Sequence, residues 1–308
     1  MATGGTITTG NIARLVEEGV NAVFGQVYDE FPVEYTYIFD EFGSTRNFEI
    51  DQQFEGFGLF SNKPEAESLE FDSQTQGYSP TYTHNTWGKA FVVSEEALED
   101  EMYGVFARRA RALAFAGRQT KEINGANILN LGFDTTSTME NGDGNALFAT
   151  DHILGPSGGT GQNKLTVDAP LSETSLEDMT ILMGKAVDTR GLRINLKPTR
   201  LIIPVDLAYV AQRILGSVLQ NYTANNATNA LRDLNAIPEG QVVNHYLTSP
   251  TAWFLKTDVV EGLKCFNRRP MRFQDDNAFT TETMRFKASE RYSFGWTDFR
   301  GAYGTTGA

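Results

Sequence analysis

Histidine, cysteine and acidic residues are the side chains of this 308-residue chain that could form a catalytic or metal site. The three histidines, His84, His152 and His245, form no HExxH or HxH pattern and no i,i+4 pair, the spacings that bring two imidazoles to one metal ion. Asp151 precedes His152, but no GxSxG sequence supplies a nucleophile for this acid and histidine. The sequence therefore predicts no metal site and no enzyme, and a hydrolase that uses Asp151 and His152 is the weaker alternative.

A glycine-rich segment at 155–161, followed by Lys164, is the second pattern that suggests ligand chemistry. It does not match GxxxxGK[ST], and no strand-to-helix turn frames it, so we interpret it as a loop. Cys265 is the only cysteine, which excludes an intrachain disulfide and any site that needs several thiolates from one chain. We interpret it as a small buried side chain. The sequence thus predicts no cofactor.

Acidic residues concentrate in the first third of the chain. The net charge is −13, and it divides into −15 over residues 1–104 and +2 over residues 105–308. Proteins that read a DNA sequence are usually basic, so this balance disfavours sequence-specific DNA binding. No run approaches the roughly 18 apolar residues of a membrane span, so no membrane contact is predicted.

The segment 46–90 has no helical period and carries many aromatic residues among acidic and turn residues. We interpret it as two extended arms joined by a turn at 61–64. Such arms find few core partners within one chain, so they are expected to lie on another molecule. The candidate contacts between subunits in this segment are Phe54, Phe57, Phe60, Lys63, Phe71, Tyr78 and Trp87.

One long helix is predicted over 94–131. Ser94 is a suitable N-cap, no proline interrupts the segment, and apolar residues that include Leu113, Ile123 and Leu129 lie close to one stripe. The helix would be about 55 Å long, several times the length of an average helix. Its charged residues are expected to face solvent or neighbouring chains, and the further contact candidates among them are Glu99, Arg108 and Arg109.

The remaining segments predict a mixed α+β fold with two lobes, the second inserted between pieces of the first. Val33–Phe39 is rich in strand formers, and a helix capped near Ser172 precedes a buried strand at 201–203. A helix beginning at Asp206 and strands at 241–247, 252–255 and within 271–299 follow. The sequence contains no internal repeat.

Several segments, in this order along the chain, resemble the major capsid proteins of tailed bacteriophages with the HK97-type fold, and the Mu-like major head subunits are the members that they resemble most. The resemblance covers most of the chain as an order of arm, extended loop, long helix, compact domain and returning strands. Singly the segments are weak signals, and together they are specific. They are ALFATDH at 146–152, TRGLRI at 189–194, PTRLIIP at 198–204, AWFL at 252–255 and FGWTDFRG at 294–301.

The resemblance implies a domain division and a function. The implied parts are an N-terminal arm at 1–30, a first P-domain part at 31–149 with an E-loop at 46–90 and a spine helix at 94–131, an A-domain at 150–268, and C-terminal P-domain strands at 269–308. It implies self-assembly through hexamers and pentamers into an icosahedral virion shell around double-stranded DNA, contacted non-specifically. A separate scaffold protein and a portal would take part, in the host cytoplasm. An encapsulin-like shell of the same fold is the alternative.

Overall fold

The computed structural model divides into two compact units, each described by itself. Unit 1 comprises Met1–Val33, His84–Ile123 and Asn267–Tyr292, and unit 2 comprises Glu34–Thr83, Asn124–Phe266 and Ser293–Ala308. The residues that the structure describes are 24–25, 28, 30–94, 96–97, 105–155, 159–219, 227–260, 262–278 and 280–307.

A four-stranded sheet runs in the order β1-β10-β11-β4. Its strands are β1 (Asp40–Gly43), β10 (Leu263–Ala278), β11 (Thr283–Trp296) and β4 (Asn85–Ser94). In unit 1, β11 pairs antiparallel with β4, so that Phe286 lies opposite Phe91. Residues alternate along β11, with Met284 and Phe286 buried and Lys287 exposed. This alternation gives the sheet one apolar and one charged face.

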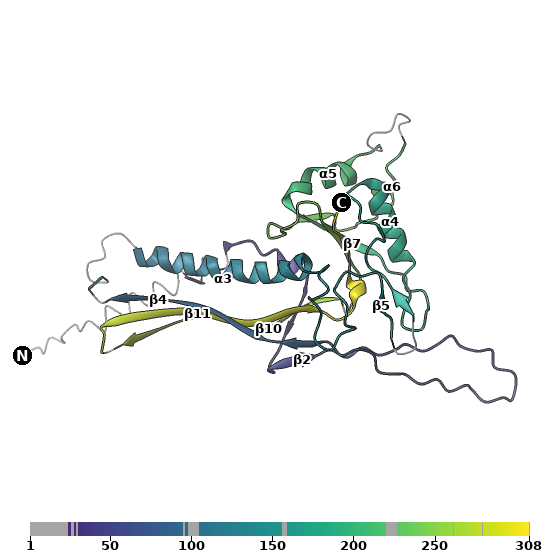
Figure 1. Ribbon diagram of the computed structural model, residues 1–308, viewed down its shortest axis with the longest axis horizontal. Helices are drawn as coiled ribbons and strands as arrows, with labels where there is room; N and C mark the ends of the chain where they lie inside the picture. Colours follow the sequence, from purple (N-terminus) through teal and green to yellow (C-terminus); the bar gives the residue numbers. More distant parts are fainter. Residues whose placement is uncertain are drawn as a thin grey trace, which may run out of the picture. The chain divides into compact units, whose positions relative to one another are not determined.

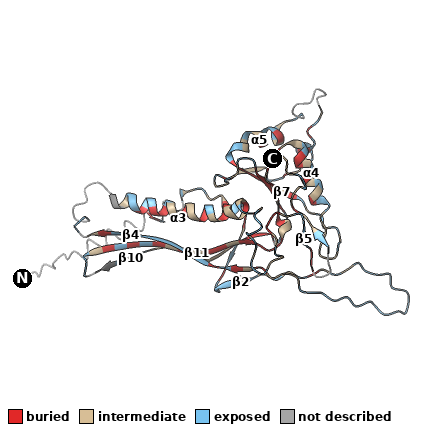
Figure 2. Ribbon diagram, in the orientation of Figure 1, coloured by how far each residue is buried: buried red, intermediate tan, exposed pale blue. Residues whose placement is uncertain are grey.

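Helix α3 (Val105–Asn130) lies along the sheet in unit 1 (Figure 1). Buried positions recur at a spacing of three or four along the helix (Figure 2), as packing on one face requires. Many of these positions hold small residues, so the helix backbone approaches its neighbours closely. A Cβ added at Gly125, for example, would lie 3.2 Å from the Cβ of Tyr35 within unit 2.

The predicted helix differs from α3 at its start and in its stripe. Ser94 is the last residue of β4, and its Oγ accepts a hydrogen bond from the Ala97 backbone N at 3.3 Å, as an N-cap does. Residues 96–97 are helical, and residues 98–104 lie outside the described residues. Leu113 and Leu129 are buried as predicted. Ile123 was predicted on the same stripe, but it is 43% exposed. Two charged side chains, Arg118 and Lys121, occupy buried positions on this face of the helix.

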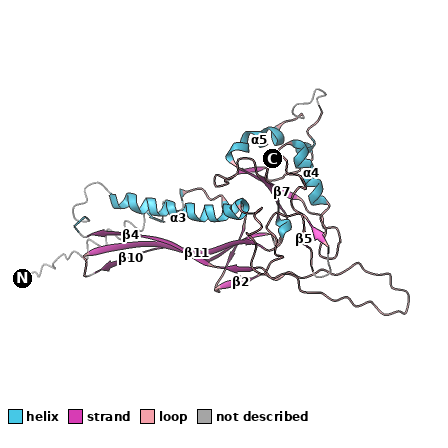
Figure 3. Ribbon diagram, viewed as in Figure 1, coloured by secondary structure: helices cyan, strands magenta, loops and turns pink. Residues whose placement is uncertain are grey.

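Unit 2 is built on a second sheet, in the order β12-β9-β7-β8. Figure 3 shows its strand β7 together with the helices α4 and α5. Only the β7–β8 pair is parallel, and the other two pairs are antiparallel. Among the described residues, three helices accompany these strands, and two further two-stranded sheets, β2-β3 and β5-β6, belong to the unit. The elements are β7 (Pro198–Ile203), β8 (Gln241–Val243), β9 (Trp253–Thr257), β12 (Ala302–Thr305), α4 (Glu173–Gly184), α5 (Ala208–Gly216), α6 (Ala230–Asp233), β2 (Phe48–Ile50), β3 (Thr81–Thr83), β5 (His152–Ile153) and β6 (Thr160–Gly161).

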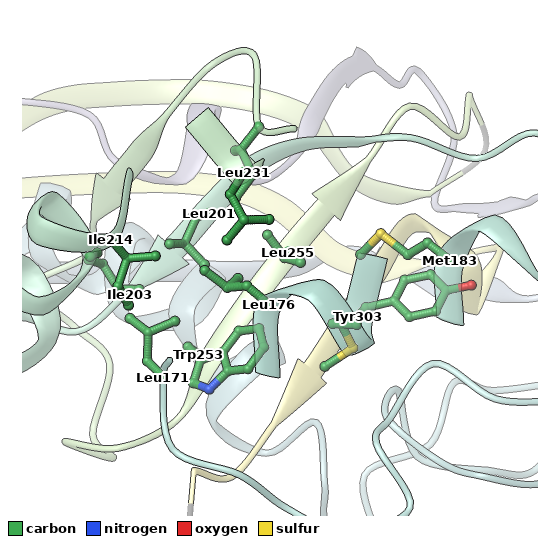
Figure 4. Close-up of a cluster of buried hydrophobic side chains, with 13 residues drawn as sticks. Leu171, Leu176, Met183, Leu201, Ile203, Ile214, Leu231, Trp253, Leu255 and Tyr303 are labelled. Carbon is green, nitrogen blue, oxygen red and sulfur yellow. The ribbon is translucent and has the colours of Figure 1, made fainter. Parts of the chain in front are cut away.

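Apolar side chains from these strands and helices form the core of unit 2 (Figure 4). Trp253 on β9 is fully buried, and its indole N donates to the Ala169 carbonyl at 3.1 Å, so burial leaves no polar atom of this side chain unsatisfied. The predicted cap of α4 is present, because Ser172 Oγ accepts from Ser175 N at 3.2 Å and Ser175 Oγ accepts from Ser172 N at 2.9 Å. The predicted strand ended by Pro204 is β7.

One segment folds differently from the sequence prediction. Val33–Phe39 was predicted as a strand, but Tyr35–Tyr37 forms the 3₁₀ helix η1. Its buried residues are Tyr35, Ile38 and Phe39, a helical spacing that a scan for β-formers overlooks. Near the end of the chain, β12 pairs with β9, and Tyr303 enters the unit 2 core. Two further 3₁₀ turns are η2 (Val205–Leu207) and η3 (Phe299–Gly301).

The α4 helix provides a test of the unit 2 core. Met179 is fully buried, so Met179→Ala removes apolar contacts and leaves a cavity, and we expect a loss of about 2–5 kcal/mol in the free energy of unfolding. Ile181 is on the same helix and 52% exposed, so Ile181→Ala should change it by only about 0.5 kcal/mol. Urea denaturation followed by tryptophan fluorescence measures both. Equal losses would contradict the assigned core.

Candidate functional site

The loop between β2 and β3 is the most unusual surface of unit 2 (Figure 1). Its two arms run antiparallel, since Gln53 N donates to Tyr78 O at 2.9 Å and Glu55 N donates to Thr75 O at 3.0 Å. Farther out, Gly58 N donates to Asp72 Oδ2 at 2.9 Å. The segment is therefore a pair of extended arms, as predicted.

The turn that joins the arms lies at Pro64–Glu67, three residues beyond the predicted position. Glu67 N donates to Pro64 O at 3.3 Å, and Ala66 has φ 67°. A positive φ at the third residue of a four-residue turn is typical of a type II turn, which glycine normally serves better than alanine. Local sequence marked the wrong position because Pro64 opens the turn instead of ending it.

Large apolar side chains of this loop stay in solvent. Phe60 is 97% exposed and Phe71 is 96% exposed, so neither ring contributes to the core of its own chain. Two hydrogen-bonded arms without a covering layer cannot bury their side chains. A group of exposed apolar residues of this size marks an interaction surface. The exposed large apolar residues of the loop are Phe54, Phe57, Leu59, Phe60, Leu69 and Phe71.

We call residues 59–71 the loop tip. The tip carries three exposed acidic residues, Glu65, Glu67 and Glu70, and one lysine, Lys63. Its surface is therefore apolar and acidic together. A surface that receives it must supply apolar area and positive charge.

The other predicted contact residues are distributed over both units. Tyr78 is half-buried, and its burial raises its pKa, with the Asp143 carboxylate adding to the shift. Trp87, in unit 1, is 39% exposed and stacks on Tyr292 with 6.3 Å between ring centroids, so it packs partly within its own unit. Arg108 and Arg109 are exposed on α3, and Glu99 lies outside the described residues.

His152 is buried and cannot reach a substrate. Its Nδ1 lies 2.5 Å from Asp143 Oδ2, its Nε2 lies 3.2 Å from Leu147 O, and its ring stacks on Phe299. The acid that contacts His152 is therefore Asp143. The adjacent Asp151 is an exposed residue. Both ring nitrogens are occupied and the side chain is fully buried, so this pair holds the loop together.

The other candidates for chemistry are also structural. His245 is exposed and its Nδ1 lies 2.6 Å from Glu34 Oε1, and Cys265 is buried as predicted. In the glycine-rich segment, Thr160–Gly161 forms strand β6, which pairs with His152–Ile153. Across the described ranges, no group of three or more His, Cys, Asp or Glu residues is placed to hold a metal ion.

Sequence reasoning missed a buried carboxyl in unit 1. Glu290 on β11 lines a cavity of about 330 Å³ under α3, and burial raises its pKa. Tyr28 Oη donates to its Oε2 at 3.2 Å, and the charges of Lys121 and Arg118 counteract part of the shift. The alternation of β11 could have placed Glu290 on the buried face.

The exposed apolar loop tip fits a protein that works through its surface. A family model for phage capsid proteins matches residues 77–305. The chain belongs to the phage capsid protein family. No curated protein sequence matches it. None of the described helices has the length and apolar character of a membrane span.

Solved capsid structures share the fold of this capsid protein at low sequence identity. The capsid of cyanophage P-SCSP1u has a TM-score of 0.58 and 9% identity, covering 90% of this chain and 88% of that chain. The procapsid of bacteriophage JBD30 has a TM-score of 0.54 and 14% identity, covering 98% of this chain and 77% of that chain. The virus-like particle from Pyrococcus furiosus has a TM-score of 0.52 and 10% identity, covering 94% of this chain and 98% of that chain. The family and these likenesses identify a major capsid protein with the HK97-type fold, as the sequence predicted.

Proposed function

We propose that this capsid protein assembles through hexamers and pentamers into an icosahedral shell around double-stranded phage DNA. Assembly takes place in the host cytoplasm with a separate scaffold protein and a portal. The β2–β3 loop serves as the E-loop, and its tip lies on a neighbouring copy. The exposure of Phe60 and Phe71 in a chain of this family is the observation that carries the proposal.

The exposed rings give the loop tip a physical reason to bind. Burying one such side chain contributes about 1.5–3 kcal/mol. A shell repeats each contact in every subunit, so a modest gain at one tip becomes a large gain for the particle. The same loop costs the monomer little, because its rings contribute nothing to the core of unit 2.

The charged face of the sheet in unit 1 is a suitable receiving surface for the tip of another copy. Arg285 and Lys287 are exposed on β11 and alternate with buried residues, and Arg272 is exposed on β10. Val92, which is 54% exposed, lies opposite Arg285 on β4 and adds apolar area. This face therefore offers the positive charge that the acidic tip requires.

The overall charge supports non-specific contact with packaged DNA. The net charge of −13 at pH 7 disfavours tight binding of phosphates, and the negative excess lies within residues 1–104. A wall that holds DNA loosely allows the genome to be packaged and released. Contacts of this kind depend on the phosphate backbone and carry no sequence information.

Electron microscopy of the chain expressed alone and together with its scaffold and portal genes tests the class of assembly. We expect closed icosahedral shells or free capsomers, and shells that contain DNA when the packaging proteins are present. Shells filled with a cargo protein would favour the encapsulin-like alternative, to which the likeness to the Pyrococcus furiosus particle lends support. A monodisperse monomer in both preparations would contradict the proposal.

Removal of the tip rings tests the loop contact. The double variant Phe60→Ser, Phe71→Ser should keep the unfolding free energy of the monomer within about 0.5 kcal/mol, because both rings are exposed. It should raise the threshold concentration for assembly at least about tenfold, the equivalent of 1.4 kcal/mol. Light scattering measures the threshold. The control Phe60→Leu, Phe71→Leu keeps apolar area and should assemble, and normal assembly of the serine variant would refute the contact.

Charge reversal tests the receiving face. Glu67→Lys with Glu70→Lys should weaken assembly, because the tip would then meet Arg285 and Lys287 with like charge. Adding Arg285→Glu and Lys287→Glu to the same chain should restore it, and the wild-type threshold should rise with salt concentration. Light scattering at several salt concentrations provides the comparison. If the variant with all four substitutions assembles no better than the variant with Glu67→Lys and Glu70→Lys alone, the tip binds elsewhere.

A further inference from the structure

One arginine of unit 2 binds both arms of the E-loop where the loop leaves the unit. Arg190 Nε donates to the Gly56 carbonyl at 3.1 Å on the first arm. Its Nη2 donates to the Ser73 carbonyl at 2.7 Å on the second arm and lies 3.4 Å from Asp72 Oδ1. A single planar group thus spans the two arms at the same level.

A tight turn presents Arg190 to the arms. Asp188 Oδ1 accepts from Arg190 N and from Leu192 N, both at 2.8 Å, and Gly191 has φ 78°, a conformation that favours glycine. Thr189 of the same turn accepts a hydrogen bond from Gly56 N at 3.4 Å. The turn therefore satisfies both backbone groups of Gly56, and the first arm has one position relative to it.

Charge reinforces the contact on each arm. The Glu55 side chain is fully buried, accepts a hydrogen bond from Thr75 Oγ1 on the opposite arm, and lies 3.7 Å from Arg190 Nε. The Gly58 N–H, together with the nearby Arg190 guanidinium, lowers the pKa of Asp72. Asp72 therefore keeps its charge at any pH near neutral, and its contact with Arg190 is lost only when the pH falls through this lowered pKa.

Among the residues that the structure describes, the loop tip has no comparable attachment to its unit. Its turn at Pro64–Glu67 is closed locally, and its rings are exposed. The direction of the tip is therefore determined at the level of Gly56 and Ser73. A small rotation there moves the tip by several ångströms, because the first arm continues through residues 57–63 before it reaches the turn.

We propose that Arg190 is the positioning residue of the E-loop, and that its contacts with both arms set the direction in which the tip reaches a neighbouring copy. This inference rests on the proposed assembly function. Arg190 acts on assembly through the loop and is not itself part of the contact. Its loss should leave unit 2 folded and should widen the range of tip positions.

The decisive variant is Arg190→Lys, which keeps a positive charge beside the buried Glu55 but cannot hold two arms with one ammonium group. Arg193→Ala removes an exposed arginine three residues away and is the matched control. Spin labels at Ser68→Cys in the tip and Thr174→Cys on α4 report the tip position within unit 2. Cys265 is buried and should not react.

We expect a narrow distance distribution by pulsed electron resonance in the wild-type background and in Arg193→Ala, and a broad one in Arg190→Lys. The assembly threshold of unlabelled Arg190→Lys should rise at least about fivefold while its thermal unfolding is unchanged, and Arg190→Ala should show a larger rise. An unchanged distance distribution in Arg190→Lys overturns the inference. Normal assembly of the Phe60→Ser, Phe71→Ser variant overturns the proposed role of the tip instead, so the two failures are distinguishable.

Discussion

The β2–β3 loop cannot bury its own apolar side chains, and the function proposed for this capsid protein depends on that constraint. Two arms hydrogen-bonded to each other satisfy their backbone but leave both faces uncovered. Phe60 and Phe71 therefore remain in water until a second surface covers them. If the tip makes the proposed contact, folding of the monomer and association of monomers use different side chains. A subunit of this kind can be stable before assembly and still gain free energy from it.

This separation between side chains for folding and side chains for association also explains the polar groups at the base of the loop. A flexible loop with exposed rings would bind many surfaces weakly, and a closed shell requires one geometry. Arg190, Glu55 and Thr75 supply directional contacts where the loop leaves unit 2. Hydrogen bonds to carbonyl groups on both arms restrict the loop without adding apolar area. Specific direction and adaptable contact are thus located in different parts of one segment.

Sequence patterns predicted the features that depend on neighbours in the chain. The Ser172 cap, the strand that ends at Pro204 and the exposed aromatic residues of the loop all follow from local composition. The resemblance of ordered segments to tailed-phage capsid proteins identified the fold, although no single segment suffices. The domain boundaries assigned from that resemblance stay a prediction.

Features that depend on distant residues were missed for the same physical reason. Asp143, nine residues from His152, takes the place expected of the adjacent Asp151, because the chain folds back between them. Arg190 is more than a hundred positions from the arms that it binds, and nothing in its local sequence marks it. The η1 turn was read as a strand because its three buried residues follow a helical spacing through a run of β-formers.

Buried charged side chains help to hold α3 in place in unit 1. A helix stripe of small residues brings the backbone close to the sheet but supplies little apolar area. Arg118 donates to the Tyr28 carbonyl at 2.9 Å, and Lys121 donates to Asn267 Oδ1 at 2.9 Å, so polar contacts fix the register that large apolar side chains would otherwise fix. Buried polar groups whose hydrogen bonds are satisfied specify one arrangement, so these contacts give the long helix a defined position within unit 1.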